Sequence, residues 1–255
     1  MKARLIARLD IKGENLIKGI QLEGLRVIGD PNSFALKYFE AGIDEFVLMD
    51  SVASLYGRNQ LSSIIEKITE NIFVPITVGG GLRNIEDCRK MLRCGADKVA
   101  INTAAFKNQK IISEVAVEFG SQCVVASIEA KKVAPLTWHA YINNGRESTG
   151  IDVVSWAKKC EELGAGEILL TSIDKEGTRS GFDFQLTENV TNSVKIPVIA
   201  SGGFGERDHL KELFTNTKVD AVAIADALHY SRFSINELRE IGVAAGREMR
   251  KIDYV

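Results

Sequence analysis

The 255-residue chain has few cysteines, few histidines and no long apolar run. Its four cysteines, Cys88, Cys94, Cys123 and Cys160, form no C-x-x-C pair, which favours reduced thiols over a disulfide framework. No apolar stretch approaches the ~20 residues that a membrane helix needs. The N-terminal residues reach Arg8 and Asp10 too soon for a signal peptide. We therefore expect a cytoplasmic globular protein with no membrane contact.

Motifs for metals, nucleotides and nucleic acids are also missing. The three histidines, His139, His209 and His229, share no ligand spacing, so we predict no metal site. The chain has no P-loop, no dinucleotide fingerprint and no G-x-S-x-G, and we predict no cofactor. Its net charge is −2 with both signs interspersed, so the sequence shows no basic patch of the kind that binds nucleic acid.

What the chain does have is an alternation of short β-rich runs with amphipathic segments. The eight runs are residues 4–10, 45–50, 73–78, 98–101, 123–129, 167–171, 197–200 and 221–224. Because the runs are almost continuously apolar, they are expected to be buried on both faces of a parallel sheet. Eight β/α units in a chain of this length predict one (β/α)₈ TIM barrel domain over residues 1–255. An open doubly wound sheet is the alternative.

The sequence also repeats itself at an offset of about 122 residues. Residues 40–51 match 162–173, and residues 74–92 match 196–214. The repeat predicts two half-barrels, and it pairs Asp10 with Glu129 across the barrel. A strand-like run with Asn-Asn-Gly in residues 137–150 predicts a hairpin after the fifth strand.

Carboxylates stand where the active sites of such barrels lie, at the C-terminal ends of the strands. Asp10, Asp50 and Glu129 end predicted strands, and Asp174 follows another. Two carboxylates that face each other suit general acid–base catalysis, because their surroundings can push their pKa values apart. We predict that Asp10 and Glu129 are catalytic; a helix cap or a rim carboxylate is the alternative for either one.

Two glycine pairs indicate anion sites, one in each half. Glycine lets backbone N–H groups approach an anion closely. The predicted phosphate-binding residues are Gly80, Gly81, Asn102 and Thr103 in the first half, and Gly202 and Gly203 in the second. The repeat aligns Thr103 with Asp226, however, and a carboxylate about 4 Å from a phosphate would cost about 4 kcal/mol. The second site is therefore predicted to be poor for phosphate, unless Asp226 only caps the last helix.

Four charged residues begin predicted strands at the opposite end of the barrel. They are Arg4, Glu45, Lys98 and Glu167. Two cations and two anions can close into a neutral ring across the barrel floor, and an ordinary solvated rim is the alternative.

The chain resembles the cyclase subunit of imidazole glycerol phosphate synthase, the HisF family. The resemblance covers almost the whole chain and is carried by "LDIKG" (9–13), "IKGIQLEGLRVIGDP" (17–31), "PITVGGGLR" (75–83), "GADKVAINTAA" (95–105), "FGSQCVV" (119–125), "LGAGEILLTSIDKEGT" (163–178) and "PVIASGG" (197–203). It implies a lyase that receives ammonia from a HisH-like glutaminase docked at the N-terminal face of the barrel. The ammonia then reaches a biphosphorylated aminoribonucleotide at the mouth.

The resemblance also implies roles for individual residues. Asp10 matches the first of the two catalytic aspartates, and the four floor charges match an ammonia gate. Gly80, Gly81, Asn102 and Thr103 match the first phosphate site, whereas Lys18, Asp50, Asp174 and Thr178 match other mouth positions.

Three residues depart from the family pattern, all at the mouth. Glu129 replaces the second aspartate, Asp226 replaces a serine, and Arg8 replaces a small residue. Arg8 is expected to hold Glu129 ionised. These departures predict a paralogue from a surface-sugar pathway, acting on a substrate of the sugar-nucleotide type. The alternatives are the authentic enzyme of histidine biosynthesis and a non-catalytic barrel that only activates a glutaminase.

Overall fold

A computed structural model describes residues 2–53 and 61–251 of the chain; the single domain predicted over 1–255 therefore includes residues that lie outside those described. Its parallel strands are β1 (Arg4–Lys12), β4 (Glu45–Asp50), β5 (Ile76–Gly79), β6 (Lys98–Ile101), β7 (Val124–Ala134), β10 (Glu167–Ser172), β11 (Val198–Ser201) and β12 (Ala221–Ile224). Each strand pairs with the next, β12 pairs with β1, and the pairing of β7 with β10 completes the closure. The predicted (β/α)₈ barrel is confirmed, and the open sheet is excluded.

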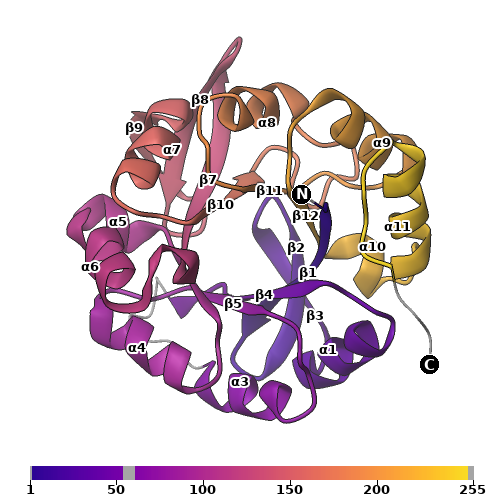
Figure 1. The fold of residues 1–255 in the computed structure, drawn as a ribbon, viewed down its shortest axis with the longest axis horizontal. Helices are drawn as coiled ribbons and strands as arrows, with labels where there is room; N and C mark the ends of the chain where they lie inside the picture. The colour runs from indigo at the N-terminus through magenta and orange to yellow at the C-terminus, as the bar shows by residue number, and fades with distance from the viewer. Residues whose placement is uncertain (1, 54–60, 252–255) are drawn as a thin grey trace.

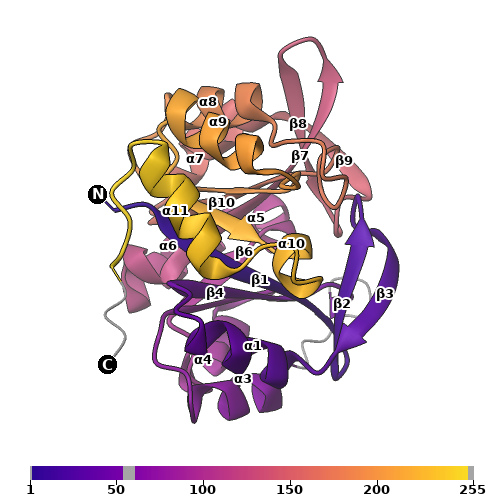
Figure 2. The same ribbon diagram turned by 90° about the vertical axis from the view of Figure 1, so that its right-hand side faces the viewer.

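Helices surround the barrel as an outer layer (Figures 1 and 2). They are α1 (Pro31–Glu40), α3 (Ser62–Thr69), α4 (Ile85–Arg93), α5 (Thr103–Lys107), α6 (Lys110–Phe119), η1 (Ser121–Cys123), α7 (Val153–Glu162), α8 (Phe184–Thr191), α9 (Arg207–Asn216), α10 (Asp226–His229) and α11 (Ile235–Ala244). Asp30, Asn84 and Asp152 cap α1, α4 and α7 through their side chains. Among the helices described, none is long and apolar enough to cross a membrane.

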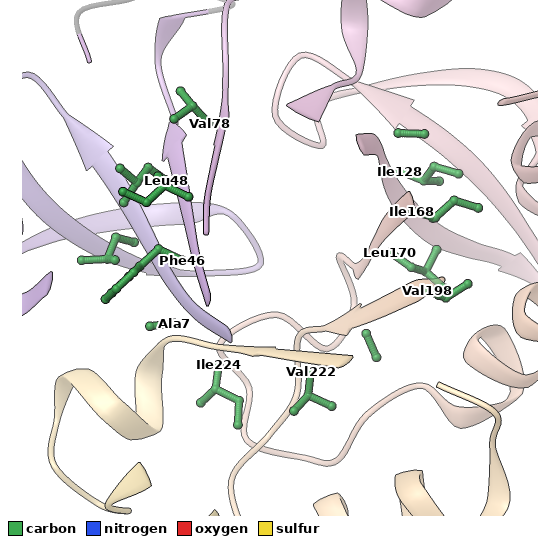
Figure 3. Close-up of a cluster of buried hydrophobic side chains, with 14 of the residues drawn as sticks. Ala7, Phe46, Leu48, Val78, Ile128, Ile168, Leu170, Val198, Val222 and Ile224 are labelled. Carbon is green, nitrogen blue, oxygen red and sulfur yellow. The ribbon is translucent and has the colours of Figure 1, made fainter. Parts of the chain in front are cut away.

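The strands are apolar on both faces because the barrel has two cores. Outward side chains such as Phe46, Leu48 and Ile168 pack under the helices (Figure 3). Inward side chains form a smaller cluster of Ile6, Val47, Ala100, Val125, Leu169, Ile199, Ala221 and Ala223. Along β1 the inward positions alternate with the outward ones, so Arg4, Ile6, Arg8 and Asp10 follow one another from the floor to the mouth.

Two hairpins extend the barrel at the mouth. Strands β8 (Thr137–Ile142) and β9 (Glu147–Asp152) form the predicted hairpin, which turns at Asn143 and Asn144 with φ of 55° and 58°. Strands β2 (Asn15–Ile20) and β3 (Glu23–Gly29) form a second hairpin that sequence reasoning missed. The two hairpins stand at equivalent places in the two halves, one after β1 and one after β7. The half-barrel repeat therefore extends to the mouth.

Candidate active site

Asp10 and Glu129 lie where a barrel strand leaves the barrel and enters a hairpin. Asp10 pairs with Met49 of β4 on one side and with Ile17 of β2 on the other. Glu129 pairs in the same way with β10 of the barrel and with β8 of the hairpin. β7 runs on to Ala134, five residues beyond the predicted end. Both carboxylates are buried, with 6% and 7% exposure, so neither is an ordinary rim residue.

The surroundings of Glu129 raise its pKa well above the usual range of a carboxyl group. Burial raises the pKa of Glu129 to about 7, and the charge of Asp10 acts in the same direction. The N–H of Gly145, which donates to Glu129 Oε2 at 2.7 Å, opposes that rise, as do Arg8 and Asn102. Arg8 acts in the expected direction, since it lowers the pKa of Glu129, but burial outweighs the attraction of the cation.

Arg8 instead forms an ion pair with Asp10. Its Nε lies 3.0 Å from Asp10 Oδ1. Its Nη1 donates to the hydroxyls of Thr171 at 2.9 Å and Ser201 at 3.2 Å. One side chain on β1 thus joins the C-terminal ends of β10 and β11.

The first glycine loop opens onto a cavity of about 160 Å³. Gly80 and Gly81 have φ of 91° and 69°, in the left-handed region that favours glycine. Asn102 and Thr103 line the same cavity as Glu129. The Thr103 hydroxyl accepts from Asn143 N at 3.1 Å, which leaves its own O–H free to donate to a ligand.

The second glycine loop lines a smaller cavity of about 20 Å³, together with Arg8 and Asp226. Gly202 and Gly203 have φ of 96° and 105°. Arg179 contacts Asp226 in a two-pronged arrangement, Nε to Oδ1 at 2.9 Å and Nη2 to Oδ2 at 3.2 Å, and Arg232 pairs with the same carboxylate. The prediction that this loop is poor for phosphate stays a prediction, but the two guanidinium groups beside Asp226 oppose the repulsion on which it was based.

The remaining mouth residues mainly hold the loops. Asp50 Oδ1 accepts from the N–H groups of the two residues that follow Ser51, and Asp174 accepts from Lys132 N at 2.8 Å. The Thr178 hydroxyl donates to a carbonyl three residues earlier at 2.8 Å. Lys18 forms a buried ion pair with Glu176, which joins the first hairpin to the segment after β10. Sequence reasoning missed Glu176, Arg179 and Arg232, which lie in loops without a periodic pattern.

The four floor charges form a closed ring of ion pairs. Arg4 lies 2.7 Å from Glu45 and 2.5 Å from Glu167, and Lys98 lies 3.1 Å and 2.9 Å from the same two carboxylates. Burial opposes the charge of Lys98, but Glu167 and Glu45 outweigh it and raise the pKa of Lys98. The structure thus has the ring geometry that the sequence predicts, rather than a solvated rim.

The fold and the mouth define a (β/α)₈ barrel with two glycine loops and two buried carboxylates at its mouth, and comparisons with known proteins narrow this class. The family model described as "Histidine biosynthesis protein" matches residues 4–234. The chain is 63% identical over 203 residues to the imidazole glycerol phosphate synthase subunit HisF of Legionella pneumophila, covering 80% of this chain and 96% of the relative. It is 48% identical over 236 residues to the HisF subunit of Bacillus cereus strain Q1, covering 92% and 94%.

The chain belongs to the HisF family of cyclase subunits of imidazole glycerol phosphate synthase. The relatives carry the name of the histidine enzyme, so they favour the histidine alternative over the predicted sugar-nucleotide paralogue.

Proposed function

We propose that this single-domain barrel is the cyclase subunit of an authentic imidazole glycerol phosphate synthase. It would convert a biphosphorylated aminoribonucleotide with ammonia supplied by a HisH-like glutaminase. The observation that carries the proposal is the placement of Asp10 and Glu129, buried at equivalent positions of the two half-barrels, between two glycine loops.

The two glycine loops suit a substrate with a phosphate at each end. The first offers backbone N–H groups at Gly80 and Gly81 with the donors Asn102 and Thr103, and it borders the larger cavity. The second offers Gly202 and Gly203, and Asp226 beside them is neutralised by Arg179 and Arg232. A phosphate at the second loop therefore meets Asp226 as part of an ion pair with two arginines and not as an isolated carboxylate.

The carboxylate pair supplies proton transfer at neutral pH. An efficient general acid or base has a pKa close to the working pH, and the pKa of Glu129 is about 7. Asp10, held by Arg8, supplies a carboxylate with a different environment on the opposite strand. The pair argues against a non-catalytic barrel, which would gain nothing from burying two carboxylates at its mouth.

The floor ring suits control of ammonia entry. Its four side chains close the N-terminal end of the barrel, directly below the apolar interior cluster. Ammonia, which is neutral and small, can cross that interior more easily than a hydrated ion. We infer that the glutaminase docks at the face where the strands begin, and that Lys98 and Glu167 line the entrance.

Four free cysteines, two of them buried, support a reducing compartment such as the cytoplasm.

A sugar-nucleotide substrate is the second candidate, and it rests on Asp226. A carboxylate accepts hydrogen bonds from sugar hydroxyls. Because Asp226 is already held by two arginines, the same residue is also compatible with phosphate, and it no longer separates the two candidates.

The purified chain, supplied with ammonium and the biphosphorylated histidine intermediate, tests the proposal. We expect turnover at ordinary enzymatic rates and none with nucleotide sugars under the same conditions. Turnover of a nucleotide sugar alone would replace the proposal by the second candidate.

A further inference from the structure

Arg8 is a buried cation on the inner face of the barrel, one inward position below Asp10. Only 4% of the residue is exposed. Hydrogen bonds from Nε and Nη1 tie its guanidinium to Asp10, Thr171 and Ser201, on three different strands. Such a group is fixed in place, because a shift of the side chain would break contacts with β1, β10 and β11 together.

The guanidinium also lies between the two halves of the mouth. Arg8 lines the cavity of the first glycine loop, and it lines the cavity of the second. Below it on β1 comes Ile6, which belongs to the apolar interior cluster. Arg8 is therefore where the interior of the barrel, the two cavities and the carboxylate pair meet.

Arg8 forms a direct hydrogen bond with one of the two carboxylates and not with the other. Its Nε–H bonds Asp10 directly at 3.0 Å. Glu129 accepts instead from the backbone N–H of Gly145, on the hairpin side of the mouth. Burial opposes the charge of Arg8, but Asp10, Glu176 and Glu129 together hold the pKa of Arg8 above its usual range, so it stays charged.

We propose that Arg8 is a positioning residue that divides the proton-transfer roles, fixing Asp10 as the carboxylate that accepts a proton and leaving Glu129 as the one that donates it. The Nε–H bond occupies Asp10 Oδ1 and leaves Oδ2 for the substrate. Carboxylates in unequal environments take unequal roles in acid–base catalysis. The inference rests on the proposed function, and it concerns a residue that the resemblance leaves without a role.

Other titratable groups around the pair are accounted for. Asp50 of β4 lines the cavity of Glu129, and Lys18 of β2 is paired with Glu176. Burial lowers the pKa of His229 to about 4, so this histidine is neutral around pH 7. The charged side chains that line the cavity of Glu129 are thus Arg8, Asp50, Arg83 and Lys107, and the charge of Asp10 also acts on Glu129. Those that act on Arg8 are Asp10, Glu129 and Glu176.

The test compares Arg8→Met and Arg8→Lys with the wild type, using ammonium as nitrogen source and rates normalised to unprotonated ammonia. Arg8→Met should lower kcat about 100-fold with little change in KM, because a loosened catalytic group costs on that order. Arg8→Lys, which keeps the charge, should restore part of the loss. The alkaline limb of the pH profile should move to higher pH in Arg8→Met, because a cation that lowers the pKa of Glu129 is gone.

A matched control is Arg239→Met. Arg239 is also buried and ion-paired, with Nη2 3.0 Å from Asp44 Oδ1, but it lies on α11 outside the barrel. Its loss should lower stability without moving the pH profile. If Arg8→Met proves unstable, the paired change Thr171→Val and Ser201→Ala, which frees Nη1 alone, should give a smaller loss of kcat in the same direction.

A readout that needs no turnover separates this inference from the proposed function. The carboxyl ¹³C signal of Glu129 should titrate at a higher pH in Arg8→Met than in the wild type, whichever substrate the enzyme uses. An unchanged titration, or equal changes in kcat and pH profile for Arg8→Met and Arg239→Met, would overturn the role of Arg8. Failure of the wild type on the histidine intermediate would overturn only the proposed function.

Discussion

The floor and the mouth of this barrel are both built from buried charges, but the charges are arranged in opposite ways. At the floor, Arg4 and Lys98 each contact the same two carboxylates, so every charge is balanced by its neighbours. At the mouth, Arg8 forms an ion pair with Asp10, whereas the pKa of Glu129 is set mainly by burial. Balanced charges make a closed, neutral layer, whereas unequal ones keep a carboxyl group titrating near pH 7. This is the difference that the proposed function requires between a gate and a reaction centre.

The largest effect is expected from Glu129→Gln, which removes the titrating group and keeps the shape of the side chain. Loss of a general acid or base typically costs 10²- to 10⁴-fold, so we expect kcat to fall by about that factor. The fall should be the same with glutamine and with ammonium, because the reaction at the mouth follows the delivery of ammonia. Steady-state kinetics with both nitrogen sources check it.

Glu129→Asp serves as the control, because it keeps the acid and moves it by one methylene. It should retain more activity than Glu129→Gln. Full activity of Glu129→Gln on the true substrate would remove Glu129 from the chemistry.

Glu129→Gln should also stabilise the fold at high pH. The pKa of Glu129 is raised from 4.5 to about 7, so the folded state binds more protons between these values and stability falls as pH rises through that window. Above pH 7 the buried carboxylate costs up to about 3 kcal/mol, which Glu129→Gln removes. Urea unfolding should show the gain at pH 8 and none at pH 4. A gain of equal size at both pH values would mean that the proton on Glu129 is not its source.

A smaller effect is expected at the first glycine loop. A Cβ on Gly80, where φ is 91°, would collide with the carbonyl oxygen of Asp50. Gly80→Ala should therefore lower the free energy of unfolding by about 1–3 kcal/mol and weaken the binding of inorganic phosphate. Gly246→Ala is the matched control, since Gly246 has φ of 79° with open space around it. The two variants should differ in thermal shift with phosphate. Equal shifts would mean that the loop does not take part in phosphate binding.

The smallest effect is expected from Asp226→Asn. Arg179 is half-exposed, at 49% of its side chain, so its ion pair contributes at most about 1 kcal/mol. Removing the carboxylate charge should raise phosphate affinity at the second loop a little, because the two arginines then face the anion alone. Phosphate titration by calorimetry checks the direction, and weaker phosphate binding would show that Asp226 helps to build the site.

Much of the fold could be predicted from the sequence, because burial on both faces leaves continuous apolar strands. The repeat then placed Asp10 opposite Glu129, and the strand starts placed the floor charges. The β2–β3 hairpin could not be found this way, since it stands over the mouth and β3 has no buried residue to give a period.

The partners of the mouth residues could not be predicted either. Arg8 reaches strands more than 160 residues away in sequence, and the choice between Asp10 and Glu129 depends on side-chain direction within the closed barrel. Arg179 and Arg232 meet Asp226 from two loops whose paths no local pattern fixes.

The separation of the two ends is tested most directly by Lys98→Met in complex with the glutaminase, with rates measured on the histidine intermediate from glutamine and from ammonium. Lys98 contacts both floor carboxylates and does not line the cavity at the mouth. We predict that the glutamine-supported rate falls while the ammonium-supported rate stays close to that of the wild type. Equal losses with the two nitrogen sources would contradict it.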